Sequence, residues 1–218
     1  MMKGSREQIA GKRTCKDWDV FKSSLEVGGD GAAWQTAFED FYLERLRHRY
    51  LDPIKVIQEN GTLQGEGFSI VTLQCSLIEF LESTIQGKSY RYAKQDKDLS
   101  THEYRLSGEM FVNFLCTREP FVKEFTKSVA QDFYEGVRCG LLHEARTKKN
   151  WRIWARSPDG KSVIDVEKKL LYRDGFQKEL DMFIEWYRVA LLSNSSFQEA
   201  FVRKFDSLCT CDAHVAPS

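Results

Sequence analysis

The stretch FSIVTLQCSLIEFLESTI, residues 68–85, is apolar over much of the circumference of a helix. Its apolar side chains recur at spacings of three and four residues, which is the period of an α-helix. A helix that is apolar on most sides has to be surrounded by other elements to be removed from water. We therefore expect residues 68–85 to form the central helix of the fold.

The same period recurs on both sides of this segment, with Trp34, Phe38 and Phe41 on one apolar face upstream. Residues 87–103 are polar and are expected to form a loop. Further helices are expected at 34–46, ended by Pro53 with a short continuation to residue 60, and at 110–119, 121–146, 176–192 and 197–208. These segments predict a mainly α-helical bundle.

The period changes after residue 150. Residues 151–156, WRIWAR, alternate as strand residues do, and residues 157–160, SPDG, are typical of a turn because proline fixes one φ and glycine accepts a positive φ. Residues 163–166 can return as a second strand, so we predict a β-hairpin insertion at about 151–172. The polar residues 1–33 are expected to be a loosely ordered arm, with one short helical turn possible around Trp18–Phe21, before a single helical domain over 34–212.

The composition argues against several classes of protein. Basic and acidic residues number 32 each, so the net charge is zero and any nucleic-acid binding has to come from a local patch. No stretch approaches the roughly 20 apolar residues of a membrane span, and the N-terminus lacks the apolar segment of a signal peptide. We expect a cytoplasmic protein with no membrane contact and no cofactor.

The six cysteines are scattered, and Cys75, Cys116 and Cys139 fall inside apolar helical patterns. Free, buried thiols in a reducing compartment are the expected state of these three. Cys209 and Cys211 could bind a metal together with His214, but no second pair of ligands is evident. No metal site is therefore predicted.

The stretch FYEGVRCGLLHE, residues 133–144, combines two side chains that together can act on a phosphodiester. Arg138 can clamp a phosphate through two hydrogen bonds and stays charged at any working pH. His143 can move protons near pH 7. A basic run, Arg146 to Lys149, follows them.

The spacing Arg138-x4-His143, late in a helix and followed by a basic turn, resembles the Arg-x4-6-His motif of HEPN domains, over about residues 68–146. HEPN domains are small helical bundles, and many are metal-independent ribonucleases of toxin, antiviral-defence and RNA-processing systems. The resemblance implies catalysis by Arg138 and His143 on single-stranded RNA, at a homodimer interface, with an antitoxin or another protein as a further partner. One departure is Cys139, where the family often has a polar residue.

Auxiliary and RNA-binding residues follow from the same hypothesis. Glu79 or Glu82 could supply a family-like acidic partner, and Glu144 directly follows His143. Cations that flank the two tryptophans of residues 151–154 could hold single-stranded RNA while the rings stack on bases. The RNA-binding residues predicted in this way are Arg146, Lys148, Lys149 and Arg152.

Simpler interpretations stay open. Arg138 could pair with Glu135 on the helix surface, and His143 could be a favourable cation at a helix C-terminus. The chain would then be a non-catalytic interaction or RNA-binding module of HEPN type, or an ordinary helical protein. The tryptophans could simply cover the helices, and the basic residues at 45–49 could be a solvated face. The segment Gly65-Glu66-Gly67 lacks the lysine of a phosphate-binding loop, so the sequence does not predict nucleotide binding.

Overall fold

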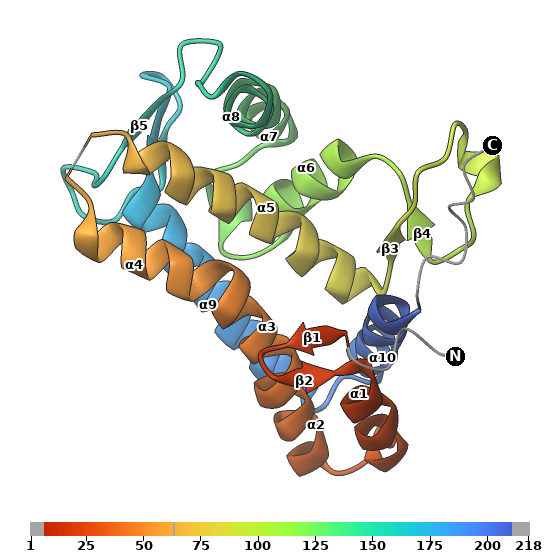
Figure 1. Cartoon of the computed structure of the whole chain (residues 1–218). Coiled ribbons are helices and arrows are strands. Elements are labelled where there is room, and N and C mark those ends of the chain that lie inside the picture. Colours follow the sequence, from red (N-terminus) through yellow and green to blue (C-terminus); the bar gives the residue numbers. More distant parts are fainter. Residues whose placement is uncertain (1–6, 63, 211–218) are drawn as a thin grey trace. The chain divides into compact units, whose positions relative to one another are not determined.

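The computed structural model describes residues 7–62 and 64–210, and the fold is mainly α-helical with small strands (Figure 1). The contacts divide it into two compact units. Unit 1 contains described residues of Met1–Arg49, Ser83–Arg105 and Arg188–Ser218, and unit 2 contains Tyr50–Glu82 and Leu106–Tyr187. The division does not follow the expected boundary at residue 33, because residues before and after it belong to unit 1.

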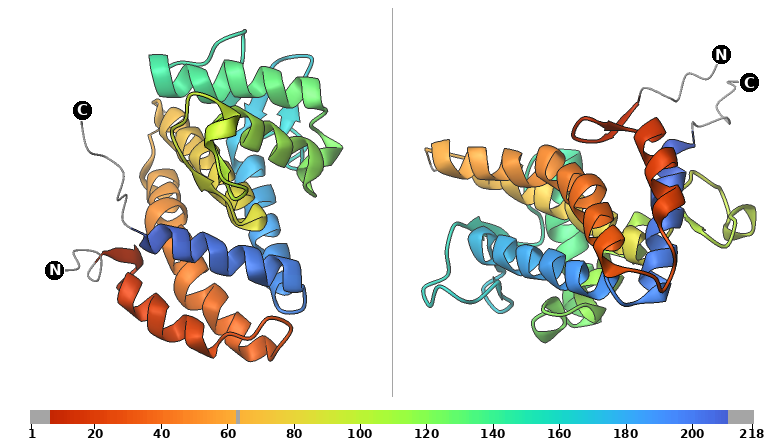
Figure 2. Two further views of the ribbon diagram at one scale, coloured as in Figure 1. Left: turned by 90° about the vertical axis from the view of Figure 1, so that its right-hand side faces the viewer. Right: turned by 90° about the horizontal axis from the view of Figure 1, so that it is seen from below.

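Unit 1 is built from short elements and from the ends of two long helices. Its own elements are β1 (Gln8–Ala10), β2 (Arg13–Thr14), α1 (Cys15–Phe21), η2 (Lys22–Ser24), α2 (Gly31–Ala37), η3 (Phe38–Leu43), α3 (Glu44–Leu46), η4 (Arg47–Leu51, shared with unit 2), β3 (Ser89–Tyr90), η5 (Asp96–Asp98), β4 (Glu103–Tyr104) and α10 (Ser195–Cys209). β1 pairs antiparallel with β2, and β3 pairs parallel with β4 inside the segment expected to be a loop. Both views in Figure 2 place α10 beside α1.

The expectation of a loosely ordered N-terminal arm is wrong for its described residues. Thr14 and Asp17 form a capping box that starts α1, with each side chain satisfying a backbone N–H of the other residue. The Trp18 ring is fully buried against Phe41 and Phe205. Its indole N–H donates to Asp206 at 2.8 Å, so α1 is attached to α10. The polar composition of the segment predicted disorder, whereas the capping box and the buried Trp18 ring fold it against α10.

Unit 2 holds the helix expected to be central. Its elements are α4 (Asp52–Asn60), most of α5 (Glu66–Gln86), α6 (Ser107–Thr117), η6 (Phe121–Lys123), α7 (Lys127–Phe133), η7 (Tyr134–Arg138), α8 (Cys139–Glu144), β5 (Arg152–Trp154), β6 (Ile164–Asp165), β7 (Leu170–Tyr172) and most of α9 (Arg173–Leu191). Apolar residues of α5 such as Ile70, Leu77 and Leu81 are completely buried. Within the described ranges α5 alone is long and apolar enough to cross a membrane, and 61% of its most apolar window is buried in the protein, as in a core helix.

Two helical boundaries differ from those expected. Pro53 does not end the first helix, since α2, η3, α3, η4 and α4 follow one another without a gap from Gly31 to Asn60. Pro53 lies within this continuous run, just after the π-helical turn η4. The helix expected over 121–146 begins later, at Lys127 after the Thr126 cap, and then runs without a gap through α7, η7 and α8 to Glu144.

The small sheet of unit 2 has a different strand order from the predicted hairpin. β7 is the central strand, paired parallel with β5 and antiparallel with β6. The true hairpin joins β6 to β7, where Asp165 accepts a hydrogen bond from the Lys168 backbone and Lys169 has a positive φ of 54°. The three residues of β7 are all buried, which suits a central strand, and the SPDG turn lies in the connection from β5 to β6.

Candidate functional site

Arg138 lies at the end of η7 and is held by side chains of α5 and η7. Its Nη2 is 3.8 Å from Glu79 Oε2, and its guanidinium carbon lies 5.4 Å from the centre of the Tyr134 ring. The Arg138 side chain is 20% exposed, so water or a ligand can reach it. The structure thus brings Glu79, one of the predicted auxiliary residues, to the motif arginine. Glu82 pairs with Arg118 instead.

The surroundings of Arg138 shift the pKa of two neighbours. Burial raises the pKa of the Cys75 thiol to about 12, against the opposing effect of the Arg138 charge. Burial likewise raises the pKa of the Tyr134 hydroxyl, again opposed by Arg138. Both groups therefore stay neutral at physiological pH, which leaves the carboxylate of Glu79 facing the arginine. Tyr134 was not singled out from the sequence, although it lies one helical turn before Arg138.

His143 lies in the last turn of α8 and faces solvent. It makes no hydrogen bond or ion pair within residues 7–62 and 64–210. Five residues advance a helix by about 500°, which places Arg138 and His143 roughly 140° apart around the axis. Arg138 turns toward α5, so the two motif side chains do not meet within one chain. The position of His143 also fits a cation at a helix C-terminus.

Two glycines on η7 and α8 determine the path of the chain after the motif. A Cβ on Gly140 would lie 2.5 Å from the Arg146 carbonyl oxygen, and one on Gly136 would lie 2.5 Å from Trp151 Cδ1. The bare backbone lets the chain fold back, with the Lys148 N–H donating to the Gly136 carbonyl at 2.6 Å. Residues 146–151 are therefore fixed against the helix that carries Arg138.

The predicted RNA-binding cations have protein partners. Arg146 pairs with Glu144 at 3.1 Å and Lys148 pairs with the same carboxylate, so Glu144 neutralises the basic run instead of assisting His143. Lys149 pairs with Glu135 and with Asp132, the latter at 3.4 Å. Glu135, considered as a partner of Arg138, binds Lys149 instead. Three of the four predicted RNA-binding cations are therefore already paired with carboxylates.

The structure also shows the partners of Arg152, of the two tryptophans and of the basic segment at 45–49. Arg152 donates to the Lys168 carbonyl oxygen at 3.3 Å. Trp151 is buried against Phe133, as core packing requires, whereas Trp154 is exposed. In the basic segment at 45–49, Arg47 and His48 pair with Glu44, and the two other arginines donate to carbonyl groups of β1.

Asp132 makes the stability of the protein depend on pH. Burial opposes its ionisation, but hydrogen bonds from Lys169 and Trp151 outweigh burial and hold the pKa of Asp132 below its usual 3.8. A lowered pKa contributes stability above the usual value that is lost as the pH falls below it. We expect Asp132→Asn to destabilise the protein by about 1–2 kcal/mol at pH 7 and by less at pH 3. Urea unfolding at both pH values measures this.

The matched control for that prediction is Glu135→Gln, which removes a more exposed partner of Lys149. It should change the free energy of unfolding by less than about 1 kcal/mol. An Asp132→Asn cost that stays the same between pH 7 and pH 3 would contradict the assignment of the lowered pKa.

An apolar groove lies beside the motif helix. Its volume is about 420 Å³, and its lining residues are Phe68, Ser69, Thr72 and Leu73 of α5 with Leu141 and Ala145. Leu142, next to His143, is also exposed. The α5–α8 face thus combines an apolar groove with the partly exposed Arg138, whereas the exposed His143 diverges from Arg138 around the helix.

The described residues contain no group of three or more His, Cys, Asp or Glu placed to hold a metal ion. Cys209 is a free thiol, while Cys211 and His214 of the metal alternative lie outside the described residues. Comparisons of the chain with protein-family models, with curated proteins and with solved structures gave no match.

Proposed function

We propose that the chain is a HEPN-like, metal-independent endoribonuclease that acts on single-stranded RNA as a homodimer. The observation that carries the proposal is the placement of Arg138. It is partly exposed between Glu79 and Tyr134, with an unpaired, exposed His143 on the helix that follows. A guanidinium and a solvent-accessible histidine, brought together from two copies of the chain, would be a minimal set of groups for metal-free phosphodiester cleavage.

The proposal requires a second copy of the chain, because Arg138 and His143 diverge around one helix. A twofold interface on the α5–α8 face would place each motif opposite its copy. The groove of Phe68, Leu73 and Leu141 with the exposed Leu142 offers apolar surface for such an interface. The site would then contain two arginines and two histidines.

In that site Arg138 would bind the scissile phosphate and stabilise the charge that develops on its oxygens. His143 would remove the proton of the RNA 2′-hydroxyl, or protonate the leaving 5′-oxygen. The 2′-oxygen would attack phosphorus as the bond to the 5′-oxygen breaks, which leaves a 2′,3′-cyclic phosphate and a 5′-hydroxyl. Glu79 would act as a positioning residue for Arg138.

The test is cleavage of end-labelled single-stranded RNA in EDTA. We expect Arg138→Ala and His143→Ala each to lower the rate by about 10²- to 10⁴-fold. Arg138→Lys should be almost as damaging, since lysine cannot form the paired hydrogen bonds of a guanidinium. Matched controls are Arg91→Ala and His102→Ala, which remove an exposed arginine and an exposed histidine outside the predicted catalytic and RNA-binding residues.

Cleavage that survives in both Arg138→Ala and His143→Ala would exclude this site. A wild-type protein that is monomeric by light scattering yet cleaves RNA would exclude the shared interface. If Glu79 positions Arg138, the rate loss caused by Arg138→Ala should be smaller in a Glu79→Gln background than in wild type. Glu79→Gln should leave the dimer intact.

A second candidate function is a non-catalytic interaction module. The ion pairs of the basic run favour it, because Arg146, Lys148 and Lys149 already pair with Glu144, Glu135 and Asp132. This alternative predicts no cleavage by wild-type protein and a dimer or complex that Arg138→Ala does not disturb. Analytical ultracentrifugation beside the RNA assay separates the two functions.

A further inference from the structure

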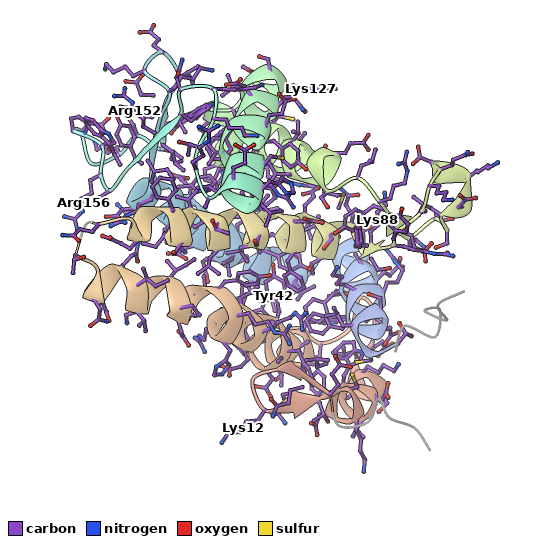
Figure 3. All side chains as sticks on the ribbon, turned by 45° about the horizontal axis from the view of Figure 1, so that its top comes forward. Lys12, Tyr42, Lys88, Lys127, Arg152 and Arg156 are labelled. Carbon is purple, nitrogen blue, oxygen red and sulfur yellow. The ribbon has the colours of Figure 1, made fainter. Side chains whose placement is uncertain are left out.

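A second cavity lies within unit 2, at the beginning of α5. It has a volume of about 520 Å³, within the range of small-molecule sites. Figure 3 labels Arg156, whose side chain extends outward near the start of α5. The lining residues are Gly65, Glu66, Gly67 and Phe68 of the α5 end, Ile153, Trp154, Ala155 and Arg156 of and after β5, and Arg173.

Arg173 is a buried cation that has two ion-pair partners but whose Nε forms no hydrogen bond. It is 7% exposed, its Nε is buried without a hydrogen bond, and no other side-chain hydrogen bond of Arg173 is present in the described ranges. Its nearest carboxylates, Asp174 and Glu66, lie at 3.5 and 3.7 Å. A buried guanidinium without hydrogen bonds is costly unless an acceptor completes it. An anion entering the cavity would supply that acceptor.

The beginning of α5 adds backbone donors on the same cavity. The N–H of Gly67, in the first turn, has no carbonyl partner inside the helix, and a helix start favours negative charge. A Cβ on Gly67 would lie 3.2 Å from Ile153 Cγ2 and 3.4 Å from Arg173 Nη1, so the glycine keeps this space open. Gly65 adopts a φ of 109°, which turns the chain into the helix.

Apolar aromatic rings line another part of the cavity. Trp154 is 48% exposed and Phe68 is 40% exposed, although both are large apolar rings. Exposed rings beside a cation site suit a ligand that has a flat aromatic part and an anionic part. Arg156 also lines the cavity and pairs with Asp174 at 3.1 Å.

We propose that this cavity binds a nucleoside 5′-phosphate, with the phosphate at Arg173, Arg156 and the start of α5 and the base against Trp154 and Phe68. The ligand is either a free mononucleotide or the phosphorylated 5′ end of an RNA. The glycine-flanked segment 65–67 lacks the lysine of a phosphate-binding loop, and Arg173, from a distant part of the sequence, supplies the cation instead. The site is independent of the proposed ribonuclease function.

The test is calorimetric titration of the full chain with AMP, GMP and UMP, with adenosine, with inorganic phosphate, and with short RNA bearing a 5′-phosphate or a 5′-hydroxyl. Mononucleotides contain no phosphodiester, so cleavage cannot interfere. We expect saturable binding of at least one mononucleotide or of the 5′-phosphorylated RNA below about 1 mM. Binding of the RNA at least ~10-fold tighter than any mononucleotide would identify an RNA end as the ligand.

Three variants locate the site. Trp154→Ala should weaken binding by about 10-fold or more, whereas Trp186→Ala, an equally exposed tryptophan outside the cavity, should not. Gly67→Ala should narrow the cavity and weaken binding, because its Cβ would lie 3.2 Å from Ile153 Cγ2, with folding checked by circular dichroism. Arg173→Gln should abolish binding, with folding checked by circular dichroism.

Several outcomes overturn the proposal. They are absence of binding by every nucleotide and RNA, equal binding of adenosine and AMP, equal binding of inorganic phosphate and nucleotides, and loss of binding in Trp186→Ala to the same extent as in Trp154→Ala. Unchanged binding in both Gly67→Ala and Trp154→Ala would also exclude this cavity.

Discussion

Replacement of Arg118 by methionine lowers the free energy of unfolding by about 3–5 kcal/mol. Arg118 is the cation that neutralises Glu82, whose side chain is 0% exposed in α5. Arg118 Nε and Nη2 each donate to Glu82 at 2.9 Å, and Asn113 donates at 2.6 Å. Without the guanidinium the carboxylate stays buried without its counter-charge and has to take up a proton or admit water. Methionine has a similar length, so lost packing contributes little.

Urea unfolding at pH 7 measures this effect. Arg146→Met is the matched control, since Arg146 pairs with Glu144 at the surface, and it should cost less than about 1 kcal/mol. The double variant Glu82→Met/Arg118→Met should recover most of the loss, because it removes both charges from the interior. A cost below about 1 kcal/mol for Arg118→Met would show that the buried carboxylate does not depend on this arginine.

Replacement of Trp18 by alanine costs about 3–5 kcal/mol. The ring is fully buried in unit 1, in contact with Phe41, Phe201 and Phe205, at centroid distances of 5.2–6.0 Å. Alanine would leave a cavity among these rings and would leave Asp206 without its indole donor. The expected result is a lower melting temperature together with loss of the attachment between α1 and α10.

Thermal unfolding measures the melting temperature of Trp18→Ala, and limited proteolysis tests whether α1 has detached from α10. Trp186→Ala is the control, because that ring is 44% exposed and lies at a tilt of 37° beside Phe183. It should change stability by less than about 1 kcal/mol. If Trp18→Ala and Trp186→Ala cost the same, α1 would not be part of the folded core.

The sequence predicted the elements whose cause is local. The apolar period of residues 68–85 is present in the chain itself, so α5 and its burial could be foreseen. The order of β5, β6 and β7 could not, because the SPDG turn signal is real but the pairing depends on which strand is buried on both faces. The Thr14-x-x-Asp17 spacing of a capping box is present in the sequence, but the polar residues around it favoured a loosely ordered segment over a packed helix.

The candidate site was likewise predictable only in part. Arg138 and His143 could be selected by residue type, and their angular separation followed from helix geometry. The contact of Arg138 with Glu79 depends on how α5 packs against η7, which a single sequence does not encode in readable form. The acids that neutralise Lys149 are 14 and 17 residues away in sequence, so the charge balance emerges only after Gly136 and Gly140 let the chain fold back.

The division of unit 1 among three separate stretches of chain has a consequence for synthesis on the ribosome. Trp18 and Phe41 emerge early, but Phe201 and Phe205, which cover them, lie on the last helix. At roughly 5–20 residues per second, the nascent chain spends on the order of 10 s with these early rings uncovered. Unit 2, made of later and closer segments, can fold first, so the early part of the nascent chain is where a chaperone is needed most.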